Sequence, residues 1–192
     1  HRLYPEVELV IKSGATEDLM DLAKSDEIDL IFTLDKKIYS SQWMCTAERV
    51  EDTIFVTSDR VFAQKSNIHS IQHLTKEAFL LTETGAAYRY ELEQMLAEKE
   101  IEIVPVLEIG NTETIINLLK RGMGISFLPE FNVKEEIEKG VLFEIRTDLP
   151  GVKMYHQLLY HKNKWMTPQM KAFLDLVLAQ PGFREKAGCA GI

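Results

Sequence analysis

The sequence predicts an α/β fold, because stretches typical of buried strands alternate with amphipathic helices. Runs rich in β-branched and aromatic residues occur at 29–33, 53–57, 78–82 and 124–128. Between these runs, apolar residues recur with the period of a helix, as in Tyr88, Leu92 and Leu96. Strands and helices in alternation are expected to form parallel sheets with right-handed crossover connections.

Each element has its own local signal. The expected strands cover 7–11, 29–33, 53–57, 78–82, 102–109, 124–128, 142–145 and 154–160. Helices are expected at Thr16, Asn111 and Thr167, whose side chains can cap a helix N-terminus. Further helices are expected after Gly85 and over Lys134–Lys139.

Length and charge restrict the class of protein. The chain has 192 residues, enough for one large α/β domain or two small lobes, and 45% of them are hydrophobic. Its net charge of −8 argues against nucleic-acid binding by the chain itself, because phosphate neutralisation requires a basic surface. No apolar run reaches the about 18 residues of a membrane span, and no signal peptide opens the chain.

The number and spacing of the cysteines indicate the cellular compartment of the protein. Cys45 and Cys189 stand far apart without further cysteines, which suits a reducing, cytoplasmic environment better than a disulfide-linked secreted protein. Cys189 lies in a Gly- and Ala-rich tail that begins at Pro181 and is expected to fray.

Motifs for catalysis, cofactors and metals are missing from the sequence. It contains no GxSxG, no CxxC and no constellation of paired carboxylates. Gly122 and Gly124 follow a helix and precede a strand, which is the wrong order for a dinucleotide-binding loop. His69 and His73 are spaced i, i+4, but no further metal ligand accompanies them. We therefore predict no catalytic residue, no cofactor and no metal site.

Two turns between a strand and a helix carry the main candidate binding residues. Thr82, Thr84 and Gly85 belong to the first turn, and Asn111 and Thr112 to the second. Main-chain N–H groups at a helix N-terminus can bind an anion with the aid of the helix dipole, and the hydroxyls can add hydrogen bonds. Such turns on neighbouring strands would face one crevice. Ordinary helix capping is the competing interpretation at both turns.

Three stretches resemble the effector-binding domain of LysR-type transcriptional regulators. Residues 4–31 resemble the opening YPxVxL…G…L…L…xDLxI of that family, and residues 51–63 resemble its crossover strand. Residues 111–129 resemble NxExIxxLVxxGxGIxxLP, which is the most specific of the three. The order and spacing of these motifs carry the resemblance, which spans roughly residues 4–179.

The resemblance implies a fold similar to type II periplasmic binding proteins, with two Rossmann-like lobes joined by two crossover strands. Lobe I would comprise 1–57 and 159–192, and lobe II would comprise 58–158. A small-molecule effector would bind between them. Besides the two turns, the implied site includes Thr33 at a strand end, Thr57 at the first crossover, and an apolar wall from Phe127 and Pro129. An ordinary turn at Thr33 and a core position for Phe127 are the alternatives.

By the same resemblance, the chain is the ligand-sensing domain of a cytoplasmic transcriptional regulator that forms a homodimer or tetramer. DNA would be bound only through an N-terminal helix-turn-helix domain, which is absent from the sequence, as are the first strand and helix of the regulatory domain. Helix N-termini favour anions, so an organic acid is the expected effector. The main alternative is a solute-binding protein of a transport system. An enzyme on a similar scaffold is the third, and it would need a general acid or base in the cleft.

Overall fold

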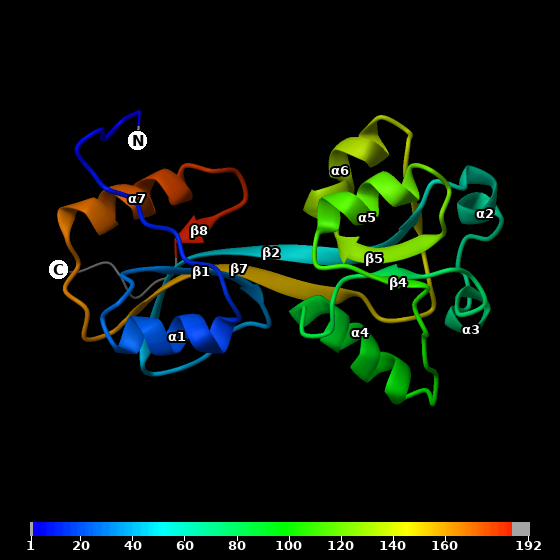
Figure 1. Ribbon diagram of the computed structural model, residues 1–192, viewed down its shortest axis with the longest axis horizontal. Helices are drawn as coiled ribbons and strands as arrows, with labels where there is room; N and C mark the ends of the chain where they lie inside the picture. Colours follow the sequence, from blue (N-terminus) through cyan, green and yellow to red (C-terminus); the bar gives the residue numbers. More distant parts are fainter. Residues whose placement is uncertain (1, 186–192) are drawn as a thin grey trace. The chain divides into compact units, whose positions relative to one another are not determined.

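The computed structural model describes residues 2–185 and divides the chain into two compact units (Figure 1). Unit 1 comprises the described residues up to Val50 and from Tyr155 onward, and unit 2 is Glu51–Met154. The chain therefore passes between the units inside strand β2 (Trp43–Thr57) and inside strand β7 (Val152–His161). The boundaries expected from the sequence, 57/58 and 158/159, fall at the end of β2 and within β7.

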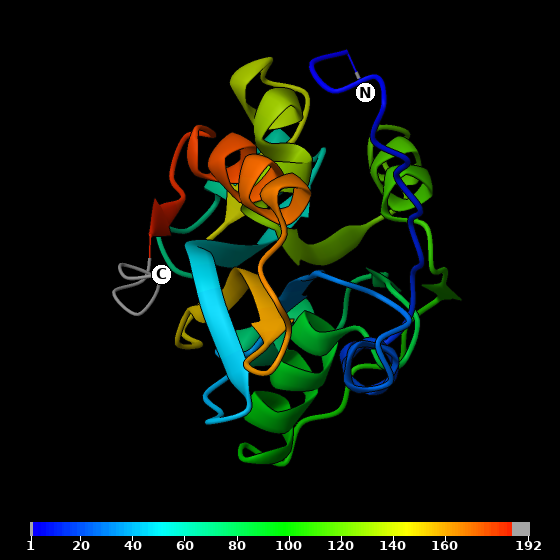
Figure 2. The same ribbon diagram turned by 90° about the vertical axis from the view of Figure 1, so that its left-hand side faces the viewer.

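Unit 1 is a sheet with one helix on each face (Figures 1 and 2). Strand β1 (Ile31–Asp35) pairs antiparallel with β7, β7 pairs with β2, and the short β8 (Arg184–Glu185) pairs with β2. Helix α1 (Thr16–Lys24) covers one face and α7 (Pro168–Leu178) the other.

Two core clusters in unit 1 match these two faces. Leu159 packs with Ala23 of α1, whereas its neighbour Leu158 packs with Leu174 of α7. Successive side chains of a strand point to opposite faces, so both leucines are buried. This is why two leucines stand side by side in the sequence of β7.

Unit 2 contains the remaining elements. Its helices are α2 (Arg60–Gln64), α3 (Ile71–Leu74), α4 (Ala87–Ala97), α5 (Thr112–Leu119) and α6 (Glu130–Glu138). Its strands are the second half of β2 and β3 (Leu80–Leu81), β4 (Leu107–Glu108), β5 (Ile125–Pro129) and β6 (Phe143–Ile145). Helices α5 and α6 lie on one side of β5, and α4 lies on the other (Figure 1).

Three phenylalanines form an aromatic cluster in the core of unit 2. The Phe55 ring lies 4.7 Å from that of Phe127 and 6.3 Å from that of Phe79, measured between centroids. Each of the three is at most 4% exposed. Because the rings come from β2, β5 and the residue before β3, the cluster ties the parallel and antiparallel parts of this unit together.

The strand directions differ from the expectation of parallel sheets. Strand β3 pairs parallel with β4, and Phe79 and Ile125 form an isolated parallel bridge. In contrast, β2 pairs antiparallel with β5, β6 and β8, and β1 pairs antiparallel with β7. A strand buried on both faces has the same apolar run in either direction, so the sequence pattern could not distinguish the two.

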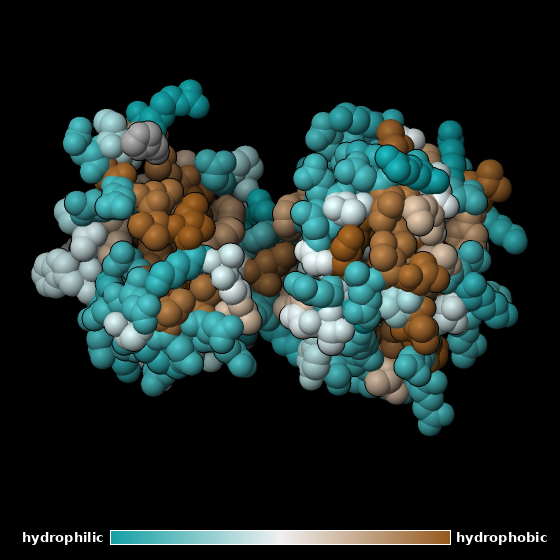
Figure 3. Space-filling view, viewed as in Figure 1, coloured by the Kyte–Doolittle hydropathy of each residue, from teal (hydrophilic) through white to brown (hydrophobic). Residues whose placement is uncertain are grey.

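Residues 7–11 are not a strand, contrary to the prediction from their β-rich sequence. Leu9, Val10 and Ile11 are 62–82% exposed. Apart from a bond from Val7 N to Tyr4 O, no main-chain hydrogen bond of this stretch occurs within the described residues. The stretch lines a groove of about 630 Å³ with α1, β1 and α7, and Figure 3 shows apolar surface in this region. Without a partner ladder, β propensity alone does not make a strand.

Of the five expected helix starts, three are correct and two are wrong. A helix follows Gly85 as predicted, because α4 begins at Ala87. Asn111 and Thr167 cap α5 and α7 through their side chains, as predicted. Thr16 does not cap α1, because it is the first helical residue and Ala15 occupies the cap position without a side-chain hydrogen bond. Helix α6 begins at Glu130 rather than Lys134. Of the tail expected to fray, residues 184–185 form β8, and Cys189 lies outside the described residues.

Gly124 is required by a close approach of two backbones. Its φ is +135°, and a Cβ there would lie 2.1 Å from the main-chain oxygen of Ala78. The approach allows Ile125 N to donate to Ala78 O at 2.8 Å. The glycine therefore serves strand packing, in agreement with the rejection of a dinucleotide loop.

Candidate functional site

The structure brings the two predicted turns side by side in unit 2. Strands β3 and β4 are parallel neighbours with Leu81 opposite Glu108, and Ile109 N donates to Leu81 O at 3.1 Å. The chain leaves both strands at the same edge, so the turn after Thr82 lies beside the turn at Gly110. The Glu83 carboxyl group confirms this proximity, because its Oε2 lies 2.9 Å from the position that a Cβ on Gly110 would occupy.

The first turn leads into α4 without a side-chain cap. Ala86 holds the N-cap position and offers no side-chain acceptor to the first-turn N–H groups. Gly85 has φ of +111°, a conformation that favours glycine, and turns the chain into the helix. The capping interpretation of the hydroxyls in this turn is therefore wrong. The main-chain N–H groups in the first turn of α4 can therefore donate hydrogen bonds to an anion.

The hydroxyl of Thr82 is buried and has no hydrogen-bond partner in residues 2–185. The residue is 3% exposed and stands directly after β3, at the base of the turn. A buried hydroxyl without a partner costs roughly 1–3 kcal/mol. The position is therefore unfavourable for the protein alone, and a bound polar group at the turn could relieve it.

The second turn is occupied by ordinary helix capping. Asn111 Oδ1 accepts from Thr114 N at 2.9 Å and from Thr114 Oγ1 at 3.2 Å. The side-chain oxygen of Asn111 therefore caps α5. Only its side-chain N–H₂ group and the adjacent main chain remain to bind a ligand. Thr112 is the first helical residue and is half-buried.

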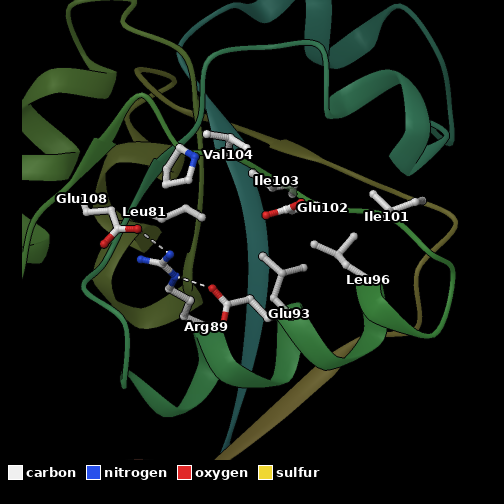
Figure 4. A pocket seen from close by; sticks show the side chains of 11 residues that line it. Leu81, Arg89, Glu93, Leu96, Ile101, Glu102, Ile103, Val104 and Glu108 are labelled. Carbon is white, nitrogen blue, oxygen red and sulfur yellow. Dashed lines mark hydrogen bonds and ion pairs between the residues drawn. The ribbon is translucent and has the colours of Figure 1, made fainter.

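Arg89 links the two turns, and sequence reasoning missed it. Its side chain is 6% exposed; Nη1 donates to the main-chain oxygen of Thr82, and Nη2 donates to Glu108 Oε1 at 2.7 Å. Nε bonds Glu93 Oε1 at 2.8 Å, and Figure 4 shows both carboxylates against the guanidinium. The i, i+4 spacing of Arg89 and Glu93 was the only signal available in the sequence.

The charges in this cluster stabilise one another. Burial alone would lower the pKa of Arg89, but hydrogen bonds to Glu108 and Glu93 outweigh it and raise the pKa above its ordinary value. The hydrogen bond from Arg89 lowers the pKa of Glu108, and a bond from the Thr84 hydroxyl contributes to the same shift. The guanidinium thus stays charged, with its charge balanced by its own neighbours.

A pocket of about 280 Å³ lies beside this cluster and away from the candidate residues (Figure 4). Its walls come from α4 and from residues 101–105, together with Leu81 and Glu108. None of the predicted site residues lines it. Arg89 and Glu108 belong to both the pocket and the link between the turns, so the pocket borders the turns without containing them.

The other predicted residues have separate environments. Thr57 Oγ1 donates to Gly124 O at 3.0 Å and accepts from Asp59 N at 3.2 Å. Its hydroxyl group is therefore used in holding the turn after β2. Phe127 lies in the aromatic cluster, the core alternative that the sequence left open, and Pro129 is buried opposite Thr53. The structure thus accounts for these three residues without a ligand.

Thr33 belongs to unit 1 rather than unit 2. It lies inside β1 opposite Gln157, is 4% exposed, and its hydroxyl lacks a hydrogen-bond partner in the described chain. The ordinary-turn alternative is wrong for this position, because β1 continues to Asp35.

The described residues contain neither a metal-binding cluster nor a membrane-spanning helix. No group of three or more His, Cys, Asp and Glu side chains there is placed to hold a metal ion. No described helix has the length and apolar composition needed to cross a membrane.

The curated proteins that are similar to the chain are named as transcriptional regulators. It is 31% identical over 187 residues to the uncharacterized HTH-type transcriptional regulator YwqM of Bacillus subtilis, covering 90% of this chain and 59% of the relative. It is 25% identical over 181 residues to the HTH-type transcriptional regulator YofA of Bacillus velezensis, covering 94% and 60%. The chain spans about three-fifths of the length of these relatives.

Solved structures show the same fold. The CcmR regulatory domain of Synechocystis PCC6803, in complex with 2-PG, matches with a TM-score of 0.75 at 23% identity, covering 93% of this chain and 85% of that one. The regulatory domain of NMB2055 (MetR) from N. meningitidis matches with a TM-score of 0.74 at 19% identity, covering 97% and 88%. The predicted type II periplasmic-binding-protein-like α/β fold is confirmed. The LysR substrate binding domain model matches residues 1–182, and the chain therefore belongs to that family.

Proposed function

We propose that the chain senses a small organic acid at the turns after β3 and β4, and that binding controls transcription through a DNA-binding domain of the full-length regulator. The buried Thr82 hydroxyl carries this proposal. It lacks a hydrogen-bond partner within the described residues and belongs to the turn that leads into α4, whose N-terminus has no side-chain cap. A carboxylate at α4 could accept from the first-turn N–H groups while another polar atom pairs with this hydroxyl.

Two structural neighbours support the class of ligand. The CcmR regulatory domain was solved with 2-PG, and the effector-binding domain of QuiR, which matches with a TM-score of 0.66 at 17% identity, was solved with shikimate. Anionic metabolites of this size also suit a site built from main-chain donors and hydroxyls. The ligand would bind without being transformed, because the ionisable groups at the turns are engaged in ion pairs or exposed.

The regulator interpretation is favoured over a transport protein. The curated relatives are named as HTH-type transcriptional regulators, and none of those described is a solute-binding protein of a transport system. We further propose a cytoplasmic homodimer or tetramer that binds DNA through a separate N-terminal domain. Units 1 and 2 would serve as its lobes I and II.

The test compares two threonine-to-valine variants. Thr82→Val removes the unsatisfied hydroxyl at nearly constant volume, so without ligand the free energy of unfolding should stay equal or rise. Thr53→Val is the comparison variant, because its hydroxyl is also buried without a partner in the described chain but belongs to β2, opposite Pro129, rather than to either turn. In a thermal-shift screen of carboxylate metabolites including shikimate, the ligand-induced shift should fall only for Thr82→Val.

The ligand-induced stabilisation of Thr82→Val should fall to about half of the parent value. One hydrogen bond to a ligand is worth about tenfold in affinity, so at 100 times the parent dissociation constant the stabilisation should fall from about 2.7 to about 1.4 kcal/mol. The same ligand-induced shift is measured for Asn111→Ala, with Thr167→Ala as its control. Both variants lose a helix cap, but only Asn111 lies at the turns. Equal ligand-induced shifts in parent and both site variants would leave Thr82 and Asn111 as structural residues.

A further inference from the structure

Glu83 lies at the centre of the two turns. Its Oε2, Cδ and Oε1 atoms lie 2.9, 3.0 and 3.1 Å from the position of a Cβ on Gly110. The carboxyl group therefore lies face-on over this glycine, where the chain turns into α5. The side chain is exposed, and no hydrogen bond or ion pair holds it within residues 2–185.

The neighbouring charges leave Glu83 without a counter-ion. Arg89 is the nearby buried cation, and its hydrogen bonds go to Glu108, Glu93 and the oxygen of Thr82. Glu113 adds a further negative charge in the first turn of α5. The N-termini of α4 and α5 thus have the carboxylates of Glu83 and Glu113 near them, and the atoms nearest to a Cβ on Gly110 are those of the Glu83 carboxyl group.

We propose that Glu83 is the charge-selecting residue of the effector site: its carboxylate lies over Gly110 and repels the negative charges of an effector bound at the turns. This inference rests on the proposed function of the turns. The unpartnered Thr82 hydroxyl, 3% exposed, is the independent sign that a polar group binds there. Effectors with one negative charge are favoured over those with two, because each charge is repelled by Glu83.

The experiment measures anion binding at the turn itself. The probes are acetate and malonate, which carry one and two carboxylates, titrated into the isotope-labelled full chain. The readout is the amide shift of Ala86, Gly110 and Asn111 in two-dimensional NMR spectra. Glu83→Gln removes the charge and keeps the shape. Glu113→Gln is the control, because it removes the same charge from the same helix end but not from above Gly110.

For Glu83→Gln, the dissociation constant of acetate at these amides should fall about fivefold, and that of malonate should fall further, because a charge at about 4 Å is removed from each carboxylate. Glu113→Gln should change either constant less than about twofold, since its charge is screened at the exposed helix end.

The outcomes separate the two proposals. If the anions shift the turn amides of parent and Glu83→Gln with equal constants, the turns bind anions and the role of Glu83 is refuted. An equal gain in Glu113→Gln would also refute it, because the effect would then come from the general acidic field. If neither anion shifts these amides in any variant, the proposed site itself fails. Binding of methylammonium that is lost in Glu83→Gln would make Glu83 a ligand for cations and overturn the inference.

Discussion

His156 shows how burial in unit 1 determines the behaviour of a single residue. Its ring lies 5.5 Å from that of Phe32 and 6.3 Å from that of Phe183, measured between centroids, and the residue is 6% exposed. Burial, together with the positive charge of Arg49, lowers the pKa of His156 to about 4. The folded chain therefore keeps this imidazole neutral at pH values at which an unfolded chain would protonate it.

A pH dependence of stability follows. An unfolded histidine has a pKa of about 6.5, so between pH 6.5 and 4 the unfolded state binds a proton that the folded state does not. The contribution of His156 to the free energy of unfolding is fully present above pH 6.5. It is lost as the pH falls towards 4, which lowers the free energy of unfolding by roughly 3 kcal/mol. His156→Leu should flatten the curve of unfolding free energy against pH in this window, measured by urea denaturation. His73→Gln, at an exposed position, should leave the curve as steep as in the parent.

Arg89 is the second residue whose role depends on its surroundings. An arginine in an amphipathic helix is expected to reach solvent, but this one is enclosed between α4 and the ends of β3 and β4. Breaking a buried ion pair from one side leaves an uncompensated charge, so the cluster holds the turns in place rather than offering a free cation to a ligand.

At the scale of elements, the start of α1 is where the chain departs from local sequence rules. Ala15 has the extended φ and ψ of an N-cap residue, −62° and 151°, but its methyl side chain cannot accept a hydrogen bond. Thr16, which the sequence favoured as the cap, lies one residue inside the helix. Main-chain donors of the first turn are thus left without a side-chain acceptor.

A pair of substitutions tests this assignment. Ala15→Ser supplies the missing acceptor and should raise the free energy of unfolding by about 1 kcal/mol in urea denaturation. Thr16→Ala should change it by only a few tenths of a kcal/mol, because that hydroxyl caps nothing. The reverse pattern, a loss of about 1 kcal/mol at Thr16 and none at Ala15, would restore Thr16 as the cap.

At the scale of the whole chain, charge governs the relation to DNA. The net charge is −8. Phosphate contacts supply most of the affinity of DNA-binding proteins and require basic side chains. We expect no sequence-selective DNA binding by this chain alone, as measured by fluorescence anisotropy with operator fragments at physiological salt. Nanomolar, sequence-selective binding that weakens with added salt would contradict the assignment of DNA binding to another domain.

Local sequence determined those features that depend on neighbouring residues. The caps at Asn111 and Thr167 and the apolar spacing of α4 were predicted, because each involves groups within about four residues of one another. The family motif at 111–129 was also readable, and with it the fold class. The two candidate turns could be predicted because a strand end followed by a helix start is itself a local pattern.

Only the tertiary structure decided what depends on residues far apart in the chain. The position of Glu83 over Gly110 and the enclosure of Arg89 by Glu108 require β3 and β4 to lie side by side. Strand direction was likewise decided only by the tertiary structure. So was the state of residues 7–11, which have β propensity but no partner strand in the described chain. The physical reason is that hydrogen bonds and charges between distant segments depend on packing, and an apolar pattern specifies which faces are buried without specifying what they meet.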